Sequence, residues 1–326
     1  MKRTIAIVCG GDSSEHDVSM RSGAGLYSFF DKDKYNIYLV ETRGMDWQVH
    51  LNDGSKTPII YKDFSFVENG TNKKFDYAYI TIHGAPGENG ILQGYFEMVK
   101  VPYSTSRVLV EALTFDKFAL NQYLRCFGVS VADSMLIRKG EESLVNPNEV
   151  EQRLGMPVFV KPSTDGSSFG VTKVKKTEEL ANALDIAFRE SDEVMVEGFL
   201  EGTEITCGCY KTKEKMVIFP ITEVVTENEF FDYDAKYNGQ VQEITPARIP
   251  EDIAERVRKI TSIIYDILHC NGIIRIDYII SPEGKVNMLE INTTPGMTVT
   301  SFIPQQVKAA GLDIKDVLSD IVENQF

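Results

Sequence analysis

The sequence predicts an α/β protein made of more than one part, and three observations support that prediction. Strand-like and helical stretches alternate over the first hundred residues, a pattern typical of a mainly parallel sheet covered by helices. The pattern restarts after Pro102, and a chain of 326 residues is longer than one core usually organises. We place the boundaries near residues 105 and 195, which gives an N-terminal part (1–105), a central part (106–195) and a C-terminal part (196–326).

The elements of the N-terminal part follow from the spacing of its apolar residues. Apolar runs bounded by turn residues predict strands over residues 4–9, 36–40, 47–51 and 77–82, and helical spacing predicts helices over 19–30 and 90–99. Two polar loops, residues 10–17 and 83–89, directly follow strands. Loops at the carboxyl ends of parallel strands are where open α/β sheets bind ligands, so both loops are candidate binding positions.

The rest of the chain gives a second and a third set of elements. In the central part we expect helices over 111–127 and 177–189 and strands over 129–137 and 158–161. The chain is then strand-rich from 194 to 221. An amphipathic helix over 251–269 follows, because isoleucines and a valine recur on one stripe at helical spacing.

Composition and charge exclude several classes of protein. The net charge is −14, whereas proteins that bind nucleic acids usually carry an excess of Lys and Arg, so a nucleic-acid binder is disfavoured. The five cysteines form no CxxC pair and are odd in number, which favours a reduced, cytoplasmic protein, and Cys207 and Cys209 lie in an apolar run as expected of core thiols. The first apolar run is too short for a signal peptide, and no stretch approaches the roughly 20 apolar residues of a membrane span. We therefore expect a cytoplasmic protein with neither nucleic acid nor membrane as partner.

The strongest local signal is a charged hairpin near the C-terminus. Residues 273–280 and 286–292 read as two strands joined by a turn-rich sequence. A period of two puts Arg275 and Asp277 on one face of the first strand. One face of the second strand should carry Met288, Glu290 and Asn292.

The pairing of this hairpin suggests a metal site. If Ile280 pairs with Lys285, Arg275 lies opposite Glu290, and Asp277 is the diagonal neighbour of Glu290 at about 7–8 Å. Two carboxylates and an amide oxygen on apolar strands are costly to bury without a cation, and oxygen ligands of this kind suit Mg²⁺. The alternative is a solvent-facing strand surface with ordinary cross-strand charge pairs.

A second signal lies at residues 158–170. An apolar strand ends in Lys161, and the loop STDGSSFG (163–170) follows. Backbone N–H groups and hydroxyls in such a loop can close over a triphosphate, although an isolated loop of this composition is more often a simple turn. Neither a GxxxxGK[ST] P-loop nor a complete GxGxxG is present, which disfavours a Rossmann dehydrogenase.

Several segments together resemble one known family. Lys117 after Asp116, Lys161 in VKP, the DGSSFG loop and the strands RID and LEIN resemble the ATP-grasp superfamily. Within it, the chain is similar to the D-alanine–D-alanine ligase family over nearly its whole length. The segments that carry this likeness are GGDSSEHDVSMRSG (10–23), IHGAPGENGILQG (82–94), VPYSTS (101–106), DKFAL (116–120), FFDYDAKY (230–237) and NTTPGMTVTS (292–301).

The resemblance implies a fold, a reaction and a set of partners. The fold would be a three-subdomain ATP-grasp fold with an N-terminal Rossmann-like (pre-ATP-grasp) domain, and ATP would lie between the central and C-terminal subdomains. The reaction would join two D-alanines through a D-alanyl phosphate, using ATP and two Mg²⁺ (or Mn²⁺) ions, to supply a peptidoglycan precursor. The family also implies a homodimer.

Carried over residue by residue, the resemblance implies the following roles. Lys117, Lys161 and Lys236 would bind the ATP phosphates, Glu197 and Leu200 would line the adenine pocket, and Glu204 would contact the ribose. Asp277, Glu290 and Asn292 would bind the metal ions. Glu15 would hold the ammonium of the first D-alanine, with His83 nearby. Arg275 and the backbone of Gly296 would form the oxyanion pocket, and Ser301 would fix the carboxylate of the second D-alanine. Ser167, Tyr237 and Glu15 would form a hydrogen-bonded set that closes the site.

The chain departs from the family pattern at a few positions. Asn89 and Asn121 stand where acidic and basic residues are usual, and Phe302 stands where an aliphatic residue is usual. These departures bear on the second substrate, so a ligase that takes D-lactate or D-serine as acceptor remains an alternative. A catalytically silent nucleotide-binding module is the alternative from another class. The retention of both phosphate lysines, the metal carboxylates and Glu15 argues against it.

Overall fold

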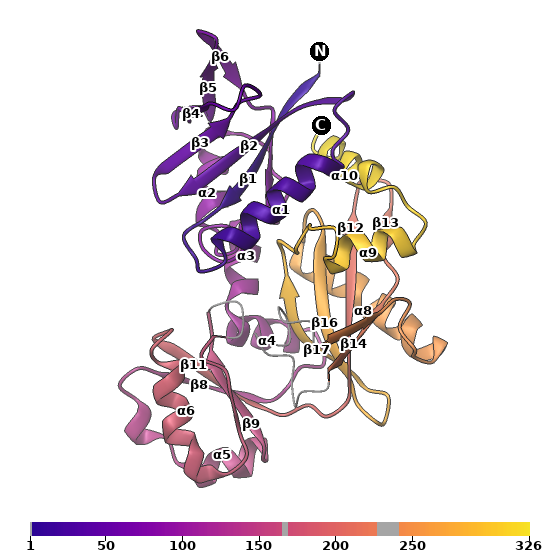
Figure 1. Cartoon of the computed structure of the whole chain (residues 1–326). Coiled ribbons are helices and arrows are strands. Elements are labelled where there is room, and N and C mark those ends of the chain that lie inside the picture. The colour runs from indigo at the N-terminus through magenta and orange to yellow at the C-terminus, as the bar shows by residue number, and fades with distance from the viewer. Residues whose placement is uncertain (1, 165–168, 227–240) are drawn as a thin grey trace.

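The computed structural model describes residues 2–164, 169–226 and 241–326. Within these ranges it shows three large sheets, one in each part of the chain, and a separate two-stranded sheet in the N-terminal part. In Figure 1 the N-terminal sheet lies at the top, the central sheet at the lower left and the C-terminal sheet at the right. The last helix, α10 (Ile314–Glu323), returns to the N-terminal part. Glu323 joins the two ends of the chain, since its carboxylate pairs with Arg3 at 2.5 Å and accepts a hydrogen bond from the Tyr35 hydroxyl at 2.7 Å.

The N-terminal sheet has the strand order β4-β3-β2-β1-β7. Strand β1 (Arg3–Gly10) is parallel to both of its neighbours, but the pairs β2–β3 and β3–β4 are antiparallel. The sheet is therefore mixed, and the prediction of a mainly parallel layer holds only for β2, β1 and β7. The remaining strands of this part are β2 (Tyr35–Arg43), β3 (Asp46–His50), β4 (Lys56–Pro58) and β7 (Tyr77–Ile80), with β5 (Ser65–Glu68) and β6 (Thr71–Lys74) forming a separate hairpin. The helices are α1 (His16–Phe29) and α2 (Ile91–Val99). Because β1 and β7 are parallel, the loops that follow them emerge at the same edge of the sheet.

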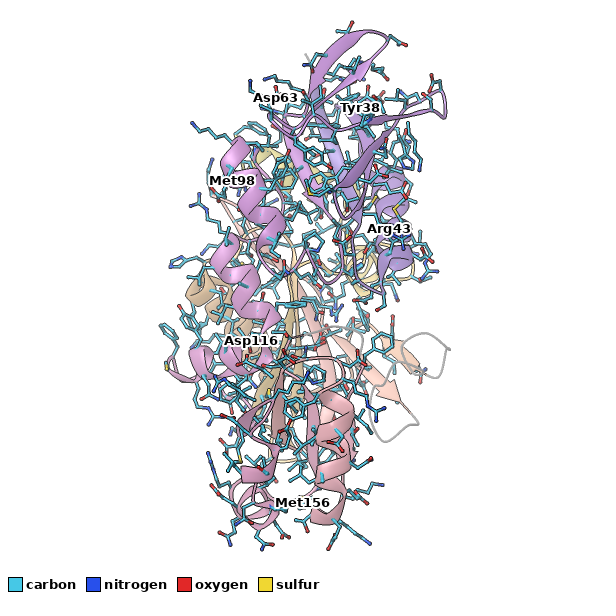
Figure 2. All side chains as sticks on the ribbon, turned by 90° about the vertical axis from the view of Figure 1, so that its left-hand side faces the viewer. Tyr38, Arg43, Asp63, Met98, Asp116 and Met156 are labelled. Atoms are coloured by element: carbon cyan, nitrogen blue, oxygen red, sulfur yellow. The ribbon has the colours of Figure 1, made fainter. Side chains whose placement is uncertain are left out.

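The helix predicted over residues 111–127 is wrong in one respect, because the chain forms two helices there. Helix α3 (Val108–Phe115) ends and α4 (Lys117–Arg125) begins at Asp116, whose backbone is extended. The Asp116 carboxylate caps α4 by accepting a hydrogen bond from the Ala119 N–H, a local bond that competes with continuing the helix. Figure 2 shows Asp116 between the N-terminal part above it and the central part around Met156 below it.

The central sheet is antiparallel, with the order β10-β9-β11-β8. Its strands are β8 (Ser134–Arg138), β9 (Val158–Pro162), β10 (Thr172–Val174) and β11 (Glu193–Gly198). Helix α5 (Pro147–Leu154) and helix α6 (Leu180–Ala187) cover it, with short 3-10 turns at Glu142–Leu144 and Thr177–Glu179. The predicted strand over 129–137 begins only at Ser134. The buried valines of β9 and β11 pack against the apolar face of α6.

The C-terminal sheet has the order β15-β14-β12-β16-β17, with β13 beside β12. Its strands are β12 (Thr203–Lys211), β13 (Met216–Ile218), β14 (Thr222–Thr226), β15 (Val241–Ile244), β16 (Ile274–Ile280) and β17 (Val286–Asn292). The predicted amphipathic helix is confirmed as α8 (Glu251–Leu268), and a further helix, α9 (Phe302–Ala309), follows β17. Cys207 and Cys209 are buried thiols of the core beneath α8, as predicted. None of the helices in the described ranges combines the length and apolar composition needed to cross a membrane.

The predicted hairpin is confirmed as β16 and β17, but its predicted register is wrong. Ile280 pairs with Val286 instead of Lys285, which shifts the register by one residue, and a bulge that leaves Leu289 without a partner shifts it by one more. As a result, Asp277 lies directly opposite Glu290 and Arg275 lies opposite Asn292. A bulge reverses the side-chain alternation at one point. Met288 therefore packs in the core, 1% exposed, while Glu290 lines the surface cleft described below.

Candidate active site

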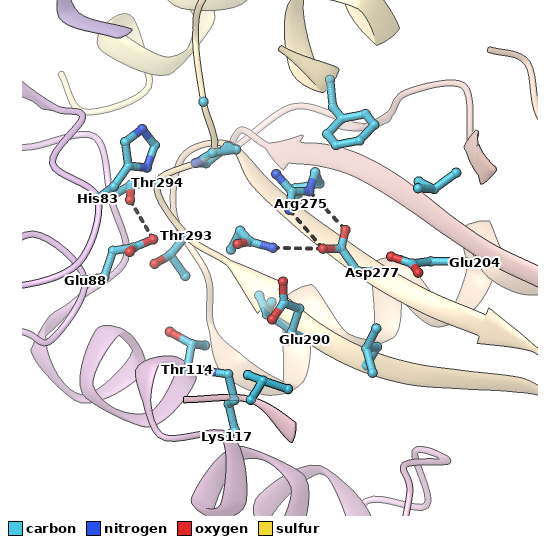
Figure 3. A pocket seen from close by; sticks show the side chains of 18 of the residues that line it. His83, Glu88, Thr114, Lys117, Glu204, Arg275, Asp277, Glu290, Thr293 and Thr294 are labelled. Atoms are coloured by element: carbon cyan, nitrogen blue, oxygen red, sulfur yellow. Dashed lines mark hydrogen bonds and ion pairs between the residues drawn. The ribbon is translucent and has the colours of Figure 1, made fainter. Parts of the chain in front are cut away.

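A cleft of about 1030 Å³ lies where the three parts of the chain meet, and it gathers most of the predicted site residues. Figure 3 shows part of its lining, with groups from the N-terminal loops on one side and the β16–β17 hairpin on the other. The predicted residues that line it are Glu15, His83, Lys117, Lys161, Glu197, Leu200, Glu204, Arg275, Asp277, Glu290, Asn292, Gly296 and Ser301. The remaining three, Ser167, Lys236 and Tyr237, lie outside the described residues.

The loop after β1 and the loop after β7 build one wall of the cleft. Glu15 stands at the start of α1, where the helix dipole favours a negative side chain. The two loops are joined by Ser13, whose hydroxyl donates to the His83 carbonyl at 2.7 Å. They also pack closely at Gly84, where a Cβ would lie 3.0 Å from the Ser13 side chain. Glu15 and His83 are thus held near each other although they lie 68 positions apart in the sequence.

Burial pushes two groups of this wall toward their neutral forms. The pKa of His83 is lowered, chiefly because desolvation disfavours the imidazolium. The pKa of Glu88 is raised to about 7, again chiefly by desolvation, although the Gly84 N–H and the Thr294 hydroxyl both donate to its carboxyl at 2.7 Å. Sequence reasoning assigned no role to Glu88. The sequence feature that could have indicated a role for Glu88 is its position in the GENG sequence, within a polar loop that follows a parallel strand.

Asp116 and Ser163 position Lys117 at the start of the loop that follows β9. The Lys117 N–H donates to the Ser163 carbonyl at 2.8 Å. The Ser163 hydroxyl donates to the Asp116 carboxylate at 2.6 Å. The break between α3 and α4 therefore brings Lys117 next to Ser163, the first residue of the STDGSSFG sequence. The sequence linked both the lysine and this segment to phosphate.

Lys161 and Glu197 form a buried ion pair on neighbouring strands β9 and β11. The Lys161 ammonium lies 2.6 Å from the Glu197 carboxylate, and the two side chains are 13% and 4% exposed. Asn121 on α4 donates to the other Glu197 oxygen at 3.1 Å. Asn121, noted above only as a departure from the family pattern, thus helps to fix a predicted adenine-contacting residue.

On the hairpin, Arg275 and Asp277 also form a bidentate ion pair. The guanidinium donates to both Asp277 carboxylate oxygens, at 3.0 and 2.9 Å (Figure 3). Burial acts to lower the pKa of Arg275, but the charge and hydrogen bonds of Asp277 outweigh it and raise that pKa further. Asp277 also accepts hydrogen bonds from Thr206 and from the Asn292 amide. The guanidinium of Arg275 also lies over the Phe302 ring, with Cζ 5.1 Å from the ring centroid.

The oxygen donors of the hairpin match what a magnesium ion takes from a protein. Asp277 and Glu290 face each other across the strands, and Asn292 supplies an amide beside them. Within the described ranges, no three His, Cys, Asp or Glu side chains gather as a metal-binding group. Two carboxylates and an amide nevertheless fit Mg²⁺, which keeps several waters and is commonly held by one or two carboxylates together with substrate phosphates.

Gly296 and Ser301 lie together in the turn between β17 and α9. The Ser301 hydroxyl accepts a hydrogen bond from the Thr298 N–H at 3.1 Å. A Cβ on Gly296 would stand 2.9 Å from that hydroxyl, so only glycine leaves the backbone of the turn accessible beside it. Ser301 immediately precedes α9, whose first N–H groups and dipole favour an anionic ligand.

Comparisons with known proteins agree with this geometry. Family models described as D-ala D-ala ligase N-terminus and C-terminus match residues 4–106 and 123–323. The D-alanine–D-alanine ligase of Phocaeicola vulgatus is 67% identical over the full length of both chains. Among solved structures, the VanG D-Ala:D-Ser ligase of Enterococcus faecalis superposes with a TM-score of 0.89 at 29% identity, covering 100% of both chains. The D-alanine–D-alanine ligase of Bacillus anthracis complexed with ATP gives 0.78 at 30% identity, covering 99% of this chain and 97% of that one.

These findings define first a class and then a family. The fold is the ATP-grasp fold, as the resemblance implied, and the class is that of ATP-dependent ligases. The chain belongs to the D-alanine–D-alanine ligase family.

Proposed function

We propose that this chain joins two D-alanine molecules to D-alanyl-D-alanine, with ATP converted to ADP and phosphate, and so supplies a peptidoglycan precursor. The observation that supports this most strongly is that side chains suited to each part of the reaction lie in the same cleft. Two lysines suited to phosphate, a hairpin with facing carboxylates and a glutamate suited to an ammonium group all line one cleft. Family membership points to the same reaction.

The first step activates a carboxylate. A carboxylate oxygen of the first D-alanine attacks the γ-phosphorus of ATP, the bond to the β-phosphate oxygen breaks, and D-alanyl phosphate and ADP result. In the proposed assignment Glu15 binds the ammonium group of that D-alanine. Lys117 and Lys161 neutralise phosphate charge, and Lys236, which lies outside the described residues, would join them.

The second step forms the peptide bond. The deprotonated amine of the second D-alanine attacks the carbonyl carbon of the acyl phosphate, and the carbon–oxygen bond to phosphate then breaks. We assign stabilisation of the tetrahedral oxyanion to Arg275 and to the backbone N–H of Gly296. Ser301 and the start of α9 would bind the carboxylate of the second D-alanine.

The cofactor proposal is two Mg²⁺ (or Mn²⁺) ions at Asp277, Glu290 and Asn292. These three residues would hold the ions together with ATP, and the ions would supply positive charge to neutralise the charge that develops on the phosphates. Arg275 already occupies both oxygens of Asp277, so the cation must share that carboxylate with the guanidinium or displace it. The adenine would contact Glu197 and Leu200 and the ribose Glu204, all of which line the same cleft.

Three further assignments rest on family membership and on composition. We propose a cytoplasmic, homodimeric enzyme whose subdomains divide near residues 105 and 195. Free thiols at all five cysteines support a reducing compartment. Exposed apolar side chains on α2 and α3 offer a surface for a second copy, since Ile91, Met98 and Leu109 are 66–77% exposed.

The identity of the second substrate is the finer part of the proposal. A solved relative that superposes over the whole chain is a D-Ala:D-Ser ligase, so the fold accommodates more than one acceptor. We propose D-alanine, with Tyr237 closing the site through Ser167 and Glu15. Tyr237→Phe should then gain measurable D-lactate incorporation, because the hydroxyl contributes roughly 0.5–3 kcal/mol to that network.

Competition among acceptors tests the whole assignment. Purified protein receives ATP, Mg²⁺ and equal concentrations of D-alanine, D-serine and D-lactate, with L-alanine as a control, while phosphate release and product masses are recorded. We expect D-alanyl-D-alanine to predominate. Predominant D-alanyl-D-serine or D-alanyl-D-lactate would overturn the acceptor assignment alone. Absence of phosphate release with every acceptor would support a silent nucleotide-binding module.

A further inference from the structure

A fully buried carboxyl group, Glu111 on α3, lies next to the hairpin, and the reaction as described assigns it no role. Its side chain is 0% exposed, and no ion pair in the part of the chain that the structure describes involves it. Desolvation raises the pKa of Glu111 well above its ordinary value, although the hydrogen bonds from Thr293 and Ser106 act in the opposite direction. Burying such a group is costly unless its hydrogen bonds are satisfied, and here both oxygens have partners.

Those two partners come from different parts of the chain. One Glu111 oxygen accepts from the Ser106 N–H at 2.8 Å, and the other accepts from the Thr293 hydroxyl at 2.6 Å. Ser106 belongs to the connection between the N-terminal sheet and α3, and its hydroxyl also accepts from the Asn271 N–H at 3.1 Å. Thr293 directly follows Asn292, the last residue of β17. Glu111 therefore ties the inter-part connection to the end of the strand that carries the metal-binding candidates.

The neighbouring residue Thr294 is held in the same manner by a different acid. Its hydroxyl donates to Glu88 at 2.7 Å, as Figure 3 shows, and also approaches the Ile82 carbonyl at 3.2 Å. Thr293 and Thr294 are each 3% exposed. Two consecutive threonines are thus fixed by two acids from separate elements, at the point where β17 ends and the turn toward Gly296 begins.

We propose that Glu111 is a positioning residue for the ligase reaction, acting through Thr293 to set the place of Asn292 and of the turn that carries Gly296. The inference rests on the proposed function, because it concerns the metal and oxyanion groups of that site. Glu111 is not one of the residues that line the cleft. Its effect is to fix the end of β17 against α3, so that the Asn292 amide faces the carboxylates on the hairpin.

Three variants and one control test this role. Glu111→Gln keeps the size and can keep both hydrogen bonds, since its amide oxygen can accept from Ser106 and its NH₂ can donate to Thr293. Thr293→Val and Glu111→Met remove the link. Tyr35→Phe is the matched control, because it also removes one hydroxyl-to-carboxylate hydrogen bond between parts of the chain, but far from the cleft. For each protein we would measure thermal unfolding, kcat, the KM for ATP, and Mn²⁺ binding by EPR in the presence of a non-hydrolysable ATP analogue.

The expected pattern separates positioning from mere stabilisation. Thr293→Val and Glu111→Met should lower kcat about 5- to 10-fold and weaken Mn²⁺ binding at least about 3-fold, the size of one lost buried hydrogen bond, with the KM for ATP nearly unchanged. Glu111→Gln and Tyr35→Phe should keep kcat and Mn²⁺ binding within about twofold of wild type, whatever their melting temperatures.

Two results would overturn the inference. One is a folded Thr293→Val protein with wild-type kcat and wild-type Mn²⁺ binding, and this variant decides the matter even if Glu111→Met does not fold. The other is a Tyr35→Phe control that loses as much kcat as Thr293→Val. Failure of the proposed function is recognised separately, because wild-type protein would then form no dipeptide at all.

Discussion

At the hairpin end of the cleft, oppositely charged side chains pair with each other, whereas at the end formed by the loops after β1 and β7 burial shifts the pKa values of His83 and Glu88 toward the neutral forms. Asp277 is ionically paired with Arg275 on rigid strands. His83 and Glu88 have pKa values shifted in opposite directions, but in each case toward the uncharged state. The difference matches two tasks. Phosphate transfer needs fixed charges that stabilise the charge developing on the phosphates. A small zwitterionic substrate such as D-alanine instead needs a site whose charge is concentrated on the group that binds its ammonium.

The largest effect should follow from altering the hairpin end of the cleft, called the charged end below, which carries Arg275, Asp277 and Glu290. Glu290→Gln removes one of the two facing carboxylates, and we expect kcat to fall at least about 100-fold, because Mg²⁺ stabilises charge formed during transfer. The control is Glu283→Gln, an exposed residue at the turn of the same hairpin, whose carboxylate accepts a hydrogen bond from the Ser281 hydroxyl. Folded Glu290→Gln protein with near-normal kcat at ordinary Mg²⁺ concentrations would show that the charged end is not the metal site.

The second largest effect should come from the end of the cleft formed by the loops after β1 and β7, called the loop end below. It should appear in the binding of the first D-alanine. Glu15→Gln replaces the proposed ammonium ligand, and the loss of a hydrogen bond to a charged group costs about 1.5–3 kcal/mol, or roughly 10- to 100-fold in the KM for the first D-alanine. The KM for ATP should change much less. Asp17→Asn is the matched control, because the Asp17 side chain is 93% exposed one residue beyond His16. An unchanged D-alanine KM in Glu15→Gln would make the glutamate purely structural.

The neutral character of the loop end predicts a pH dependence of stability. The pKa of Glu88 rises from an ordinary 4.5 to about 7 on folding, so between these values the folded state binds more protons than the unfolded state. The raised pKa of Glu88 therefore adds to the free energy of unfolding. This contribution is fully present below pH 4.5 and is lost as the pH rises through 7. Glu88→Gln cannot titrate, so the free energy of unfolding of the variant should gain about 1–2 kcal/mol relative to wild type between pH 5 and pH 8, with allowance for the side chain's contact with the cleft.

Chemical denaturation of both proteins across that pH range provides the measurement. Glu97→Gln is a suitable control, because Glu97 is a partly exposed carboxylate on α2. If the difference between Glu88→Gln and wild type stays constant from pH 5 to pH 8, Glu88 is already ionised at pH 5 and the loop end is not neutral.

The same contrast explains what the sequence could predict. The spacing of apolar residues predicted the hairpin, α8 and the parallel N-terminal strands. These elements could be predicted because each depends on a pattern of apolar residues that is local in the sequence. The helix break at Asp116 was not predicted, because it depends on one side-chain hydrogen bond that competes with continuing the helix. The bulge at Leu289 was not predicted either, because regular alternation of side chains along a strand assumes an unbroken pairing register. The neutral state of Glu88 and the burial of Glu111 escaped it for a different reason. Desolvation is set by what packs around a side chain, and those neighbours are distant in the sequence.

The smallest effect should come from Phe302, the residue that departs from the family pattern beside the charged end. Its ring lies over the Arg275 guanidinium at 5.1 Å, and Asp277 holds the same guanidinium by two hydrogen bonds. A partly exposed cation–π contact contributes about 0.5–1 kcal/mol, so Phe302→Leu should lower kcat/KM only about 2- to 5-fold. Steady-state kinetics with D-alanine measures this, and Phe302→Tyr, which keeps the ring, should remain near wild type. If Phe302→Leu instead leaves kcat/KM unchanged but shifts the ratio of D-alanyl-D-alanine to D-alanyl-D-lactate, the ring shapes the acceptor site. The charged end would then owe its geometry to Asp277 alone.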